Sequence, residues 1–213
     1  MARWIFGILA ALLLPIAAQA QTDKHASIGA GIGFHQYSDN DRFQRGFGIG
    51  FLYRVSRHPG GQNGWGWEPT ATLSLSGADY HTDTGGDDVK LGRFKTIPVM
   101  VGYGPAYRHN RTRIGFSLEA GASFNGFTID PAGERAFESA GTPLENVNVS
   151  NSFVVKPAAG LWYDLSNRVG LHTGLSYLYN HPKASITAGG VTTTSTWNAD
   201  HVSLSVGAVY GIF

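Results

Sequence analysis

The chain ends on the segment His201-Val-Ser-Leu-Ser-Val-Gly-Ala-Val-Tyr-Gly-Ile-Phe213, in which apolar side chains alternate with small or polar ones. Successive side chains of a β-strand point to opposite faces, so a period of two places all the apolar members on one face. The segment therefore predicts a strand with one apolar face and one face of histidine, serine and glycine.

Seven earlier segments repeat this alternation over about ten residues each, so the pattern predicts eight strands in all. Short connections near 57–64, 105–111 and 164–168 alternate with longer ones near 79–89, 127–150 and 181–198. With the closing strand, the expected strands run approximately over 26–37, 44–56, 65–78, 90–104, 114–125, 153–163, 169–179 and 202–212.

Alternation alone also fits a soluble sandwich, in which the apolar face forms the core. The polar face is too rich in glycine and serine to fill such a core, whereas the narrow lumen of an eight-stranded barrel needs small residues. Aromatic residues gather near the strand ends, as interfacial girdles do. The fold class predicted is therefore all-β, an antiparallel up-and-down transmembrane β-barrel with eight strands, and the expected girdle residues are Trp65, Trp67, Tyr103, Tyr107, Trp162, Tyr163, Tyr177, Tyr179 and Tyr210.

The first twenty residues have the order of a secretory signal peptide. Arg3 precedes an apolar stretch from Trp4 to Ile16, and Ala18-Gln-Ala20 supplies the small residues of a cleavage site. We expect export by the Sec pathway and cleavage after Ala20, so that residues 1–20 are the signal peptide and residues 21–213 form one barrel domain. The stretch is too short for a membrane anchor, which needs about 20 apolar residues.

Composition excludes several other classes. The chain has no cysteine, so it forms no disulfides and carries no lipid anchor on a cysteine. A formal net charge of +1 argues against a nucleic-acid partner. We predict no cofactor and no metal.

The segments Thr96-Ile-Pro-Val-Met-Val-Gly102 and Pro157-Ala-Ala-Gly-Leu-Trp-Tyr-Asp-Leu-Ser-Asn-Arg-Val-Gly-Leu171, with the terminal Phe213, resemble those of small eight-stranded outer-membrane barrels of the OmpA/OmpX type. The resemblance covers residues 21 to 213. It implies a cell outer membrane location in a Gram-negative envelope, periplasmic chaperones and the barrel-assembly machinery as partners, and Phe213 as the assembly signal. Gly207 and Gly211 share the phase of Phe213, where relatives usually carry aromatic or apolar residues.

Four charged residues fall on the lumen face of the expected barrel. Arg54 and Glu68 flank one turn at matching depth, and Glu119 and Lys156 lie near mid-barrel on adjacent strands. Buried charges are normally paired, because an isolated charge in a low-dielectric interior costs several kcal/mol. We interpret Arg54–Glu68 and Glu119–Lys156 as structural ion pairs that fill the lumen. The alternative is that they form the gate of a narrow ion pathway, which opens when the salt bridges exchange partners.

His35 and His201 fall near the outer mouth of the lumen on strands that must pair to close the barrel. They are candidates for a metal site or an acid sensor, but no third ligand stands at a diagnostic spacing. His201 and Ser203 also resemble the His-x-Ser pairing of outer-membrane lipid A deacylases. That interpretation needs a carboxylate beside the histidine, and the sequence offers none on a following strand.

Arg93 and Lys95 lie on the lipid phase of their strand at its outer end. Cationic side chains at that level could bind lipopolysaccharide phosphates or simply extend toward water.

The function favoured by these patterns is a non-enzymatic outer-membrane scaffold that presents four mobile external loops. Loops 128–150 and 181–200 are the expected contact surfaces for an extracellular ligand or for outer-membrane lipid and lipopolysaccharide. Two alternatives stay open: a narrow, porin-like channel for small or hydrophobic solutes, which an open lumen or lateral gap would favour, and a lipid A-modifying hydrolase that uses His201 and Ser203.

Overall fold

The computed structural model describes residues 24–57, 63–84 and 87–212 of the chain. The expected signal peptide over 1–20, the expected cleavage site and the expected assembly signal Phe213 lie outside the described residues.

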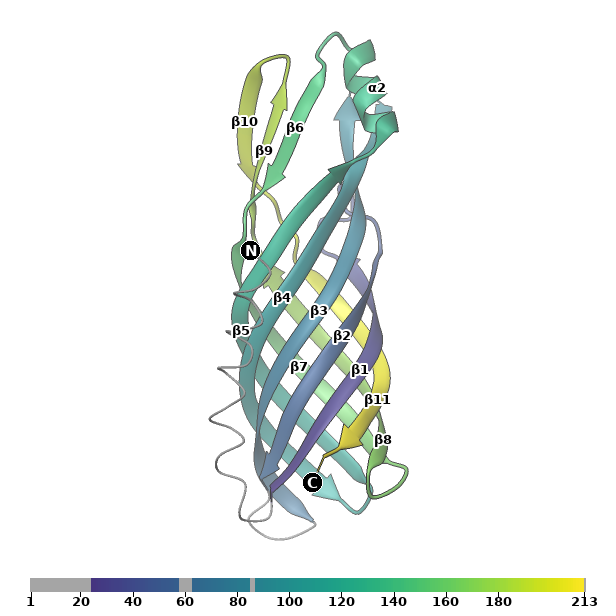
Figure 1. The fold of residues 1–213 in the computed structure, drawn as a ribbon, viewed down its shortest axis with the longest axis vertical. Helices are drawn as coiled ribbons and strands as arrows, with labels where there is room; N and C mark the ends of the chain where they lie inside the picture. The colour runs from purple at the N-terminus through teal and green to yellow at the C-terminus, as the bar shows by residue number, and fades with distance from the viewer. Residues whose placement is uncertain (1–23, 58–62, 85–86, 213) are drawn as a thin grey trace.

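Eight antiparallel strands close into a barrel in the order β1-β11-β8-β7-β5-β4-β3-β2 (Figure 1). The closure is made by β1 and β11, which pair from Ser27↔Gly211 to Tyr37↔His201. The predicted fold class is confirmed. The barrel strands are β1 (Lys24–Tyr37), β2 (Gly46–Arg57), β3 (Gly64–Thr84), β4 (Asp87–His109), β5 (Thr112–Ile129), β7 (Ser152–Asp164), β8 (Val169–Asn180) and β11 (His201–Gly211).

Glycine at the β1–β11 seam lets the two backbones approach closely inside the lumen. Gly31 lies opposite Gly207, and a Cβ on Gly31 would stand 2.6 Å from the carbonyl oxygen of Val206. A larger residue would push the seam apart, so the small face of the closing strands follows from the narrowness of the barrel.

The outer face of the barrel is apolar. Phe34 and Phe47 pack edge to face on neighbouring strands, and Leu118, Leu204 and Val206 are each more than half exposed. An apolar belt of this kind suits lipid rather than water. Most of the expected girdle residues do lie exposed at the strand ends, where Trp67 stacks on Tyr103 and Trp65 lies against Tyr107.

Trp162 is a correction to the expected girdle. Its side chain is 8% exposed and points into the lumen, because it shares the phase of Lys156, Ala158 and Gly160 on β7. The alternation along β7 therefore determines that Trp162 faces the lumen, even though it lies near the end of the strand.

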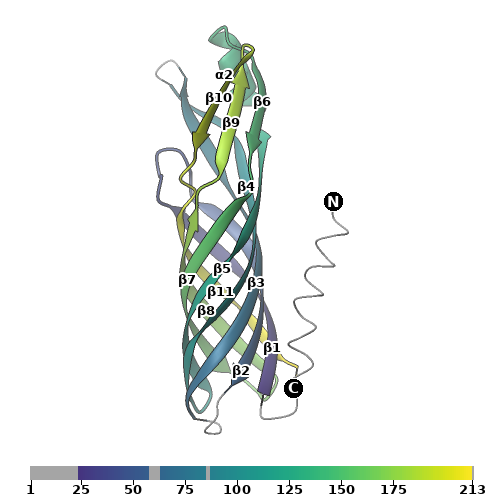
Figure 2. The same ribbon diagram turned by 90° about the vertical axis from the view of Figure 1, so that its left-hand side faces the viewer.

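Above the barrel, the chain continues as an ordered extension on one end of the molecule (Figures 1 and 2). Strands β3 and β4 continue to Thr84 and Asp87, so most of the expected loop 79–89 is strand. The other long loops also fold: residues 128–150 contain helix α2 (Pro131–Ser139) and β6 (Leu144–Val149), and residues 181–200 contain β9 (Lys183–Ala188) and β10 (Val191–Thr196). Helix and strands thus replace most of the expected loops, and their mobility stays a prediction.

Strands β6, β9 and β10 form a separate sheet in the order β10-β9-β6. A two-residue turn joins β9 to β10 through Gly189 and Gly190, whose φ angles of 55° and 74° suit glycine. No helix among the described residues is long and apolar enough to cross a membrane.

Candidate functional site: the lumen and the extension

We call the end with the connections β2–β3, β4–β5 and β7–β8 the turn end, and the opposite end, which carries the extension, the loop end. The alternation of each strand lines the lumen with its small or polar face. From the turn end to the loop end, the lumen contains a group of arginines, an ion pair, and then a histidine pair at the level of a small apolar layer.

At the turn end, two arginines surround one carboxylate. Arg54 Nε lies 3.6 Å from Glu68 Oε2, while Arg113 Nη1 donates to Glu68 Oε1 at 2.9 Å. Ser56 donates to the same carboxylate oxygen at 2.9 Å and accepts from Arg113. The structure brings the expected partners Arg54 and Glu68 together, but the shorter contact of Glu68 is to Arg113. Exposure of 2%, 4% and 6% for Arg54, Glu68 and Arg113 makes this a buried cluster.

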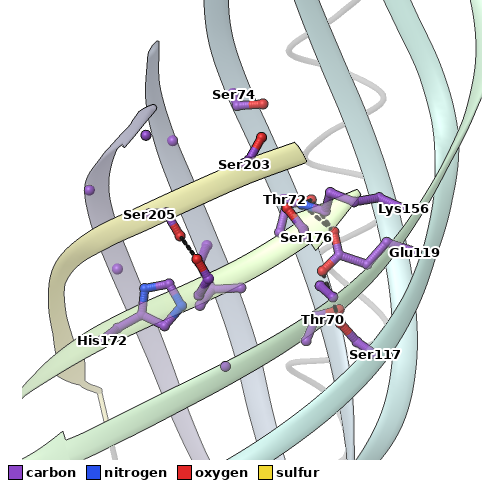
Figure 3. A pocket seen from close by; sticks show the side chains of 18 of the residues that line it. Thr70, Thr72, Ser74, Ser117, Glu119, Lys156, His172, Ser176, Ser203 and Ser205 are labelled. Carbon is purple, nitrogen blue, oxygen red and sulfur yellow. Dashed lines mark hydrogen bonds and ion pairs between the residues drawn. The ribbon is translucent and has the colours of Figure 1, made fainter. Parts of the chain in front are cut away.

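Near mid-barrel, Lys156 Nζ lies 2.8 Å from Glu119 Oε2, across the β5–β7 pair (Figure 3). Thr72 donates to the same carboxylate at 2.7 Å and Ser117 donates at 3.2 Å. Glu119 is buried and its carboxylate has several hydrogen-bond partners, which is the arrangement that makes a buried ion pair tolerable.

His35 and His201 lie side by side toward the loop end, with ring centroids 4.8 Å apart. Ser203 bonds to the Nδ1 of His35 at 2.6 Å, whereas the Nδ1 of His201 lies 3.2 Å from the carbonyl oxygen of Ala199. The serine of the expected His201–Ser203 hydrolase pair therefore has His35 as its partner. Both Ser203 and His201 are buried in the lumen, away from the lipid that such an enzyme would act on.

An internal cavity of about 170 Å³ runs along the lumen, between the turn-end cluster and the histidines. Figure 3 shows His172 and Ser205 on one side of this cavity and Glu119, Lys156 and Thr72 on the other. Toward the loop end, Met100, Val154 and Leu178 form a buried apolar layer.

The extension has its own apolar core, separated from that layer by a buried polar layer in which Thr96 bonds to Ser123 and to Asn180. Trp197 is at its centre, stacked on Tyr80 at a centroid distance of 4.1 Å and 5.9 Å from the ring of Phe43. Burial raises the pKa of the Tyr80 hydroxyl above its ordinary value. The other core members are Tyr37, Ala78, Leu91, Phe94, Val147, Val149, Ala184 and Ala199. The loop end of the lumen is thus covered by packed aromatic side chains.

Ion pairs attach α2 to the barrel strands. Lys90 Nζ on β4 lies 3.0 Å from Asp79 on β3 and 3.4 Å from Asp130, the residue that caps α2. The Ala132 backbone N–H donates to the Asp130 carboxylate, which lowers the pKa of that group. Contact with Asp79 and Asp130 raises the pKa of Lys90.

The outer edge of the three-stranded sheet is β10, whose six residues are all exposed. Its odd-numbered residues face β9, as the bond from the Trp197 N–H to the Pro182 carbonyl shows just beyond the strand. Because hydrogen-bonding directions alternate along a strand, Thr192, Thr194 and Thr196 point their backbone N–H and C=O groups away from the sheet. Hydroxyl contacts of 2.9 Å join Thr194 to Ser185 and Thr192 to Thr187 across the hairpin.

This architecture has clear relatives. The model of the outer membrane protein beta-barrel domain matches residues 6–210. The chain belongs to this family. Among solved structures it is similar to OprG of Pseudomonas aeruginosa, with a TM-score of 0.68, 15% identity, and coverage of 91% of this chain and 98% of that one. A major outer membrane protein of Thermus thermophilus gives a TM-score of 0.55 at 13% identity, covering 90% of this chain and 100% of that one.

Among curated proteins, the chain is 27% identical over 172 residues to S-layer protein A of Saccharolobus solfataricus. The match covers 74% of this chain but spans 11% of the length of that relative. The family and the solved barrels place the protein in the cell outer membrane, which confirms the expected location.

In this protein, the exposed Arg93 and Lys95 lie where the apolar belt of the barrel ends, toward the loop end. Both point outward from β4, opposite Thr128 and Gly126 of β5. Their contact with lipopolysaccharide phosphates stays a prediction.

Sequence reasoning missed two residues that organise these sites. Arg113 stands immediately before Ile114, where the expected strand began, and extending the alternation by one residue would have placed it in the lumen. Trp197 lies within the expected loop 181–198, although a lone tryptophan in a threonine-rich stretch is itself a signal of a buried anchor.

Proposed function

We propose that the protein is a non-enzymatic surface-contact protein, in which a closed barrel holds the β6–β9–β10 sheet outside the membrane and the free edge of β10 pairs with another polypeptide. The observation that carries the proposal is the edge itself. Six exposed residues, Val-Thr-Thr-Thr-Ser-Thr, form its outer strand.

Natural proteins usually protect an exposed edge strand with a charge, a proline or a bulge, because its free N–H and C=O groups pair readily with another strand. From Val191 to Thr196 the edge has no charge and no proline, and β9 and β10 pair without a register shift. Its β-branched residues also favour extended backbone. An edge left open in this way supports pairing by strand addition.

The partner strand that we propose is β10 of a second copy. No charge on β10 repels its own copy, and antiparallel self-pairing places threonine and serine hydroxyls opposite one another, as already occurs between β9 and β10. The sheet runs approximately along the barrel axis (Figure 1). Antiparallel pairing therefore points the two barrels in opposite directions, so the two copies lie in opposing membranes.

The test is clustering of phospholipid vesicles that carry the refolded full chain, followed by light scattering. We expect wild-type vesicles to cluster and vesicles with Thr194→Pro to stay separate, because proline removes an N–H from the free edge. Thr194→Val is the matched control, since it loses the same hydroxyl contact to Ser185 but keeps the N–H, and it should cluster like wild type.

Absence of clustering in the wild type would refute pairing between copies. Equal clustering by Thr194→Pro would show that the contact does not use this edge.

A scaffold role also requires a lumen that does not conduct. The Glu119–Lys156 pair and the apolar layer above it support this, and we expect only rare current steps from the refolded protein in planar bilayers. Steady conductance that changes in Glu119→Gln would instead favour a gated channel.

A lateral path for hydrophobic solutes is the second candidate, favoured by an interruption in the wall. Between Val155↔Tyr179 and Ala158↔Ser176, the β7–β8 ladder lacks its pairs, and a surface pocket lined by Pro157, Leu175 and Tyr177 lies there. Pro157 has no N–H to donate, which explains the gap.

A disulfide would test this path in a chain that has no native cysteine. Register places residues 157 and 177 opposite each other, so cells with Pro157→Cys and Tyr177→Cys should take up a long-chain alkane when reduced but not when oxidised. Equal uptake in both states would exclude the lateral path.

A further inference from the structure

The turn-end cluster contains more hydrogen-bond donors than acceptors. Four buried N–H groups have no hydrogen-bond partner among the described residues: Nε of Arg54, which lies 3.6 Å from the Glu68 carboxylate, Nη1 of Arg54, Nε of Arg113 and Nε1 of Trp162. A buried donor without a hydrogen-bond partner destabilises the folded protein, and more so when it is charged. Guanidinium and indole groups have no acceptor atoms, so these side chains cannot satisfy one another.

The charges in the cluster are also unequal. Arg54 and Arg113 contribute two positive charges against the single negative charge of Glu68, which leaves a surplus of one. The nearby Arg108 does not change this sum, because it is paired with Asp164 at 3.0 Å. An unmatched charge in a low-dielectric interior is costly.

The unpartnered groups of Arg54 and Trp162 belong to one place rather than to scattered positions. The guanidinium carbon of Arg54 lies 4.3 Å from the ring centroid of Trp162, which also packs on His172 at 5.2 Å. Arg54, Trp162, His172 and Thr70 all line the lumen cavity of about 170 Å³, and in the described part of the chain the buried hydroxyl of Thr70 likewise has no hydrogen-bond partner. A water molecule occupies about 30 Å³ in the liquid, so the cavity has room for an ion of similar size and for water around it.

We propose that this end of the lumen binds a monovalent inorganic anion of about the size of chloride, held by Arg54 and the indole N–H of Trp162, with Arg113 paired to Glu68 and supplying the surplus positive charge. The single surplus charge selects a monovalent ion. Water could accept from the same donors, but it would leave the positive charge unbalanced. The anion therefore completes both the hydrogen bonds and the charge of the cluster.

The test follows the indole N–H resonance of Trp162 in the refolded full chain, labelled with ¹⁵N-tryptophan and assigned with Trp162→Phe. Chloride replaces gluconate stepwise at constant ionic strength, so that general screening is unchanged. We expect a saturable shift of the Trp162 signal, with the signals of Trp65 and Trp67 on the outer face unaffected.

Arg113→Gln removes the surplus charge that the anion balances, and the apparent affinity for chloride should fall by at least about tenfold. Arg111→Gln is the matched control, since it removes one positive charge from an exposed position at the same end and should leave the titration unchanged. A wild-type signal that does not move with chloride would overturn the proposal and would mean that water accepts hydrogen bonds from these N–H groups. An unchanged titration in Arg113→Gln would exclude the cluster as the binding site.

Discussion

Two regions of the molecule share the same strands but have opposite polarity. In the barrel, β4 points Ile97, Val99 and Val101 outward and the buried Thr96 inward; a few residues further toward the loop end, it points Arg93 and Lys95 outward and Phe94 inward. The parity of the strand is unchanged. What changes is the type of residue on each face: the outward face is apolar where it meets lipid and charged where it meets water. The change between Lys95 and Ile97 therefore marks the outer boundary of the membrane.

The comparison teaches that one strand can serve two solvents, since β4 stays paired with β5 from Gly92 to Tyr103 across the change of polarity. Below the boundary, stability depends on the paired polar lumen and the apolar exterior. Above it, stability depends on an ordinary apolar core around Trp197.

The largest effect that separates the two regions should come from Trp197→Ala. Loss of a fully buried tryptophan costs about 3–5 kcal/mol, and this one contacts the rings of Tyr80 and Phe127. We expect hydrogen exchange to accelerate in β6, β9 and β10 while the barrel amides below Thr96 stay protected. Trp65→Ala, at an exposed girdle position, should leave the extension protected. If barrel and extension opened together in Trp197→Ala, the two regions would be one cooperative unit.

A new charge should distinguish the outer faces of the two regions. Val206→Arg places a charge in the lipid-facing belt and should cost about 2–4 kcal/mol, whereas Thr194→Arg on the exposed edge should change stability by about 0.5 kcal/mol or less. Urea unfolding of both variants in lipid vesicles measures the difference. Equal costs would mean that Val206 does not face lipid.

The smallest effect should be a dependence of α2 on pH, without a matching change in the barrel. The pKa of Asp130 is lowered in the folded protein by the Ala132 N–H, so its contribution is present above the ordinary aspartate pKa and is lost as pH falls through the lower folded value. Proteolysis within residues 131–139 should therefore increase at acidic pH. Asp130→Asn can still cap the helix but does not titrate, and its cleavage should not follow this profile. Identical acid profiles in the two proteins would assign the effect to another group.

Much of the barrel could be predicted from alternation, because the period of two persists over the full length of each spanning segment. The pairs Arg54–Glu68 and Glu119–Lys156 followed from parity and depth. Arg113 did not, since its contact with Glu68 joins β5 to β3 over the intervening β4, and the sequence pattern relates only strands that pair directly.

The extension was not predictable in the same way. Strands β9 and β10 have six residues each, and β10 presents threonine or serine on both faces, so alternation gives no signal there. The helix α2 begins after Asp130-Pro131, a recognisable capping sequence, but a helix of nine residues between barrel strands has weak support from sequence alone.

Continuous strands also fix the height of the extension above the membrane. Strand β4 has 23 residues, which at about 3.3 Å per residue cover roughly 75 Å, whereas crossing the hydrocarbon takes about 9–11 residues. The reach of the molecule is therefore encoded in strand length. Residues added in pairs to both β3 and β4 would lengthen each strand by about 7 Å per pair while keeping every side chain on its original face, so relatives with the same barrel can differ in reach through insertions of even length.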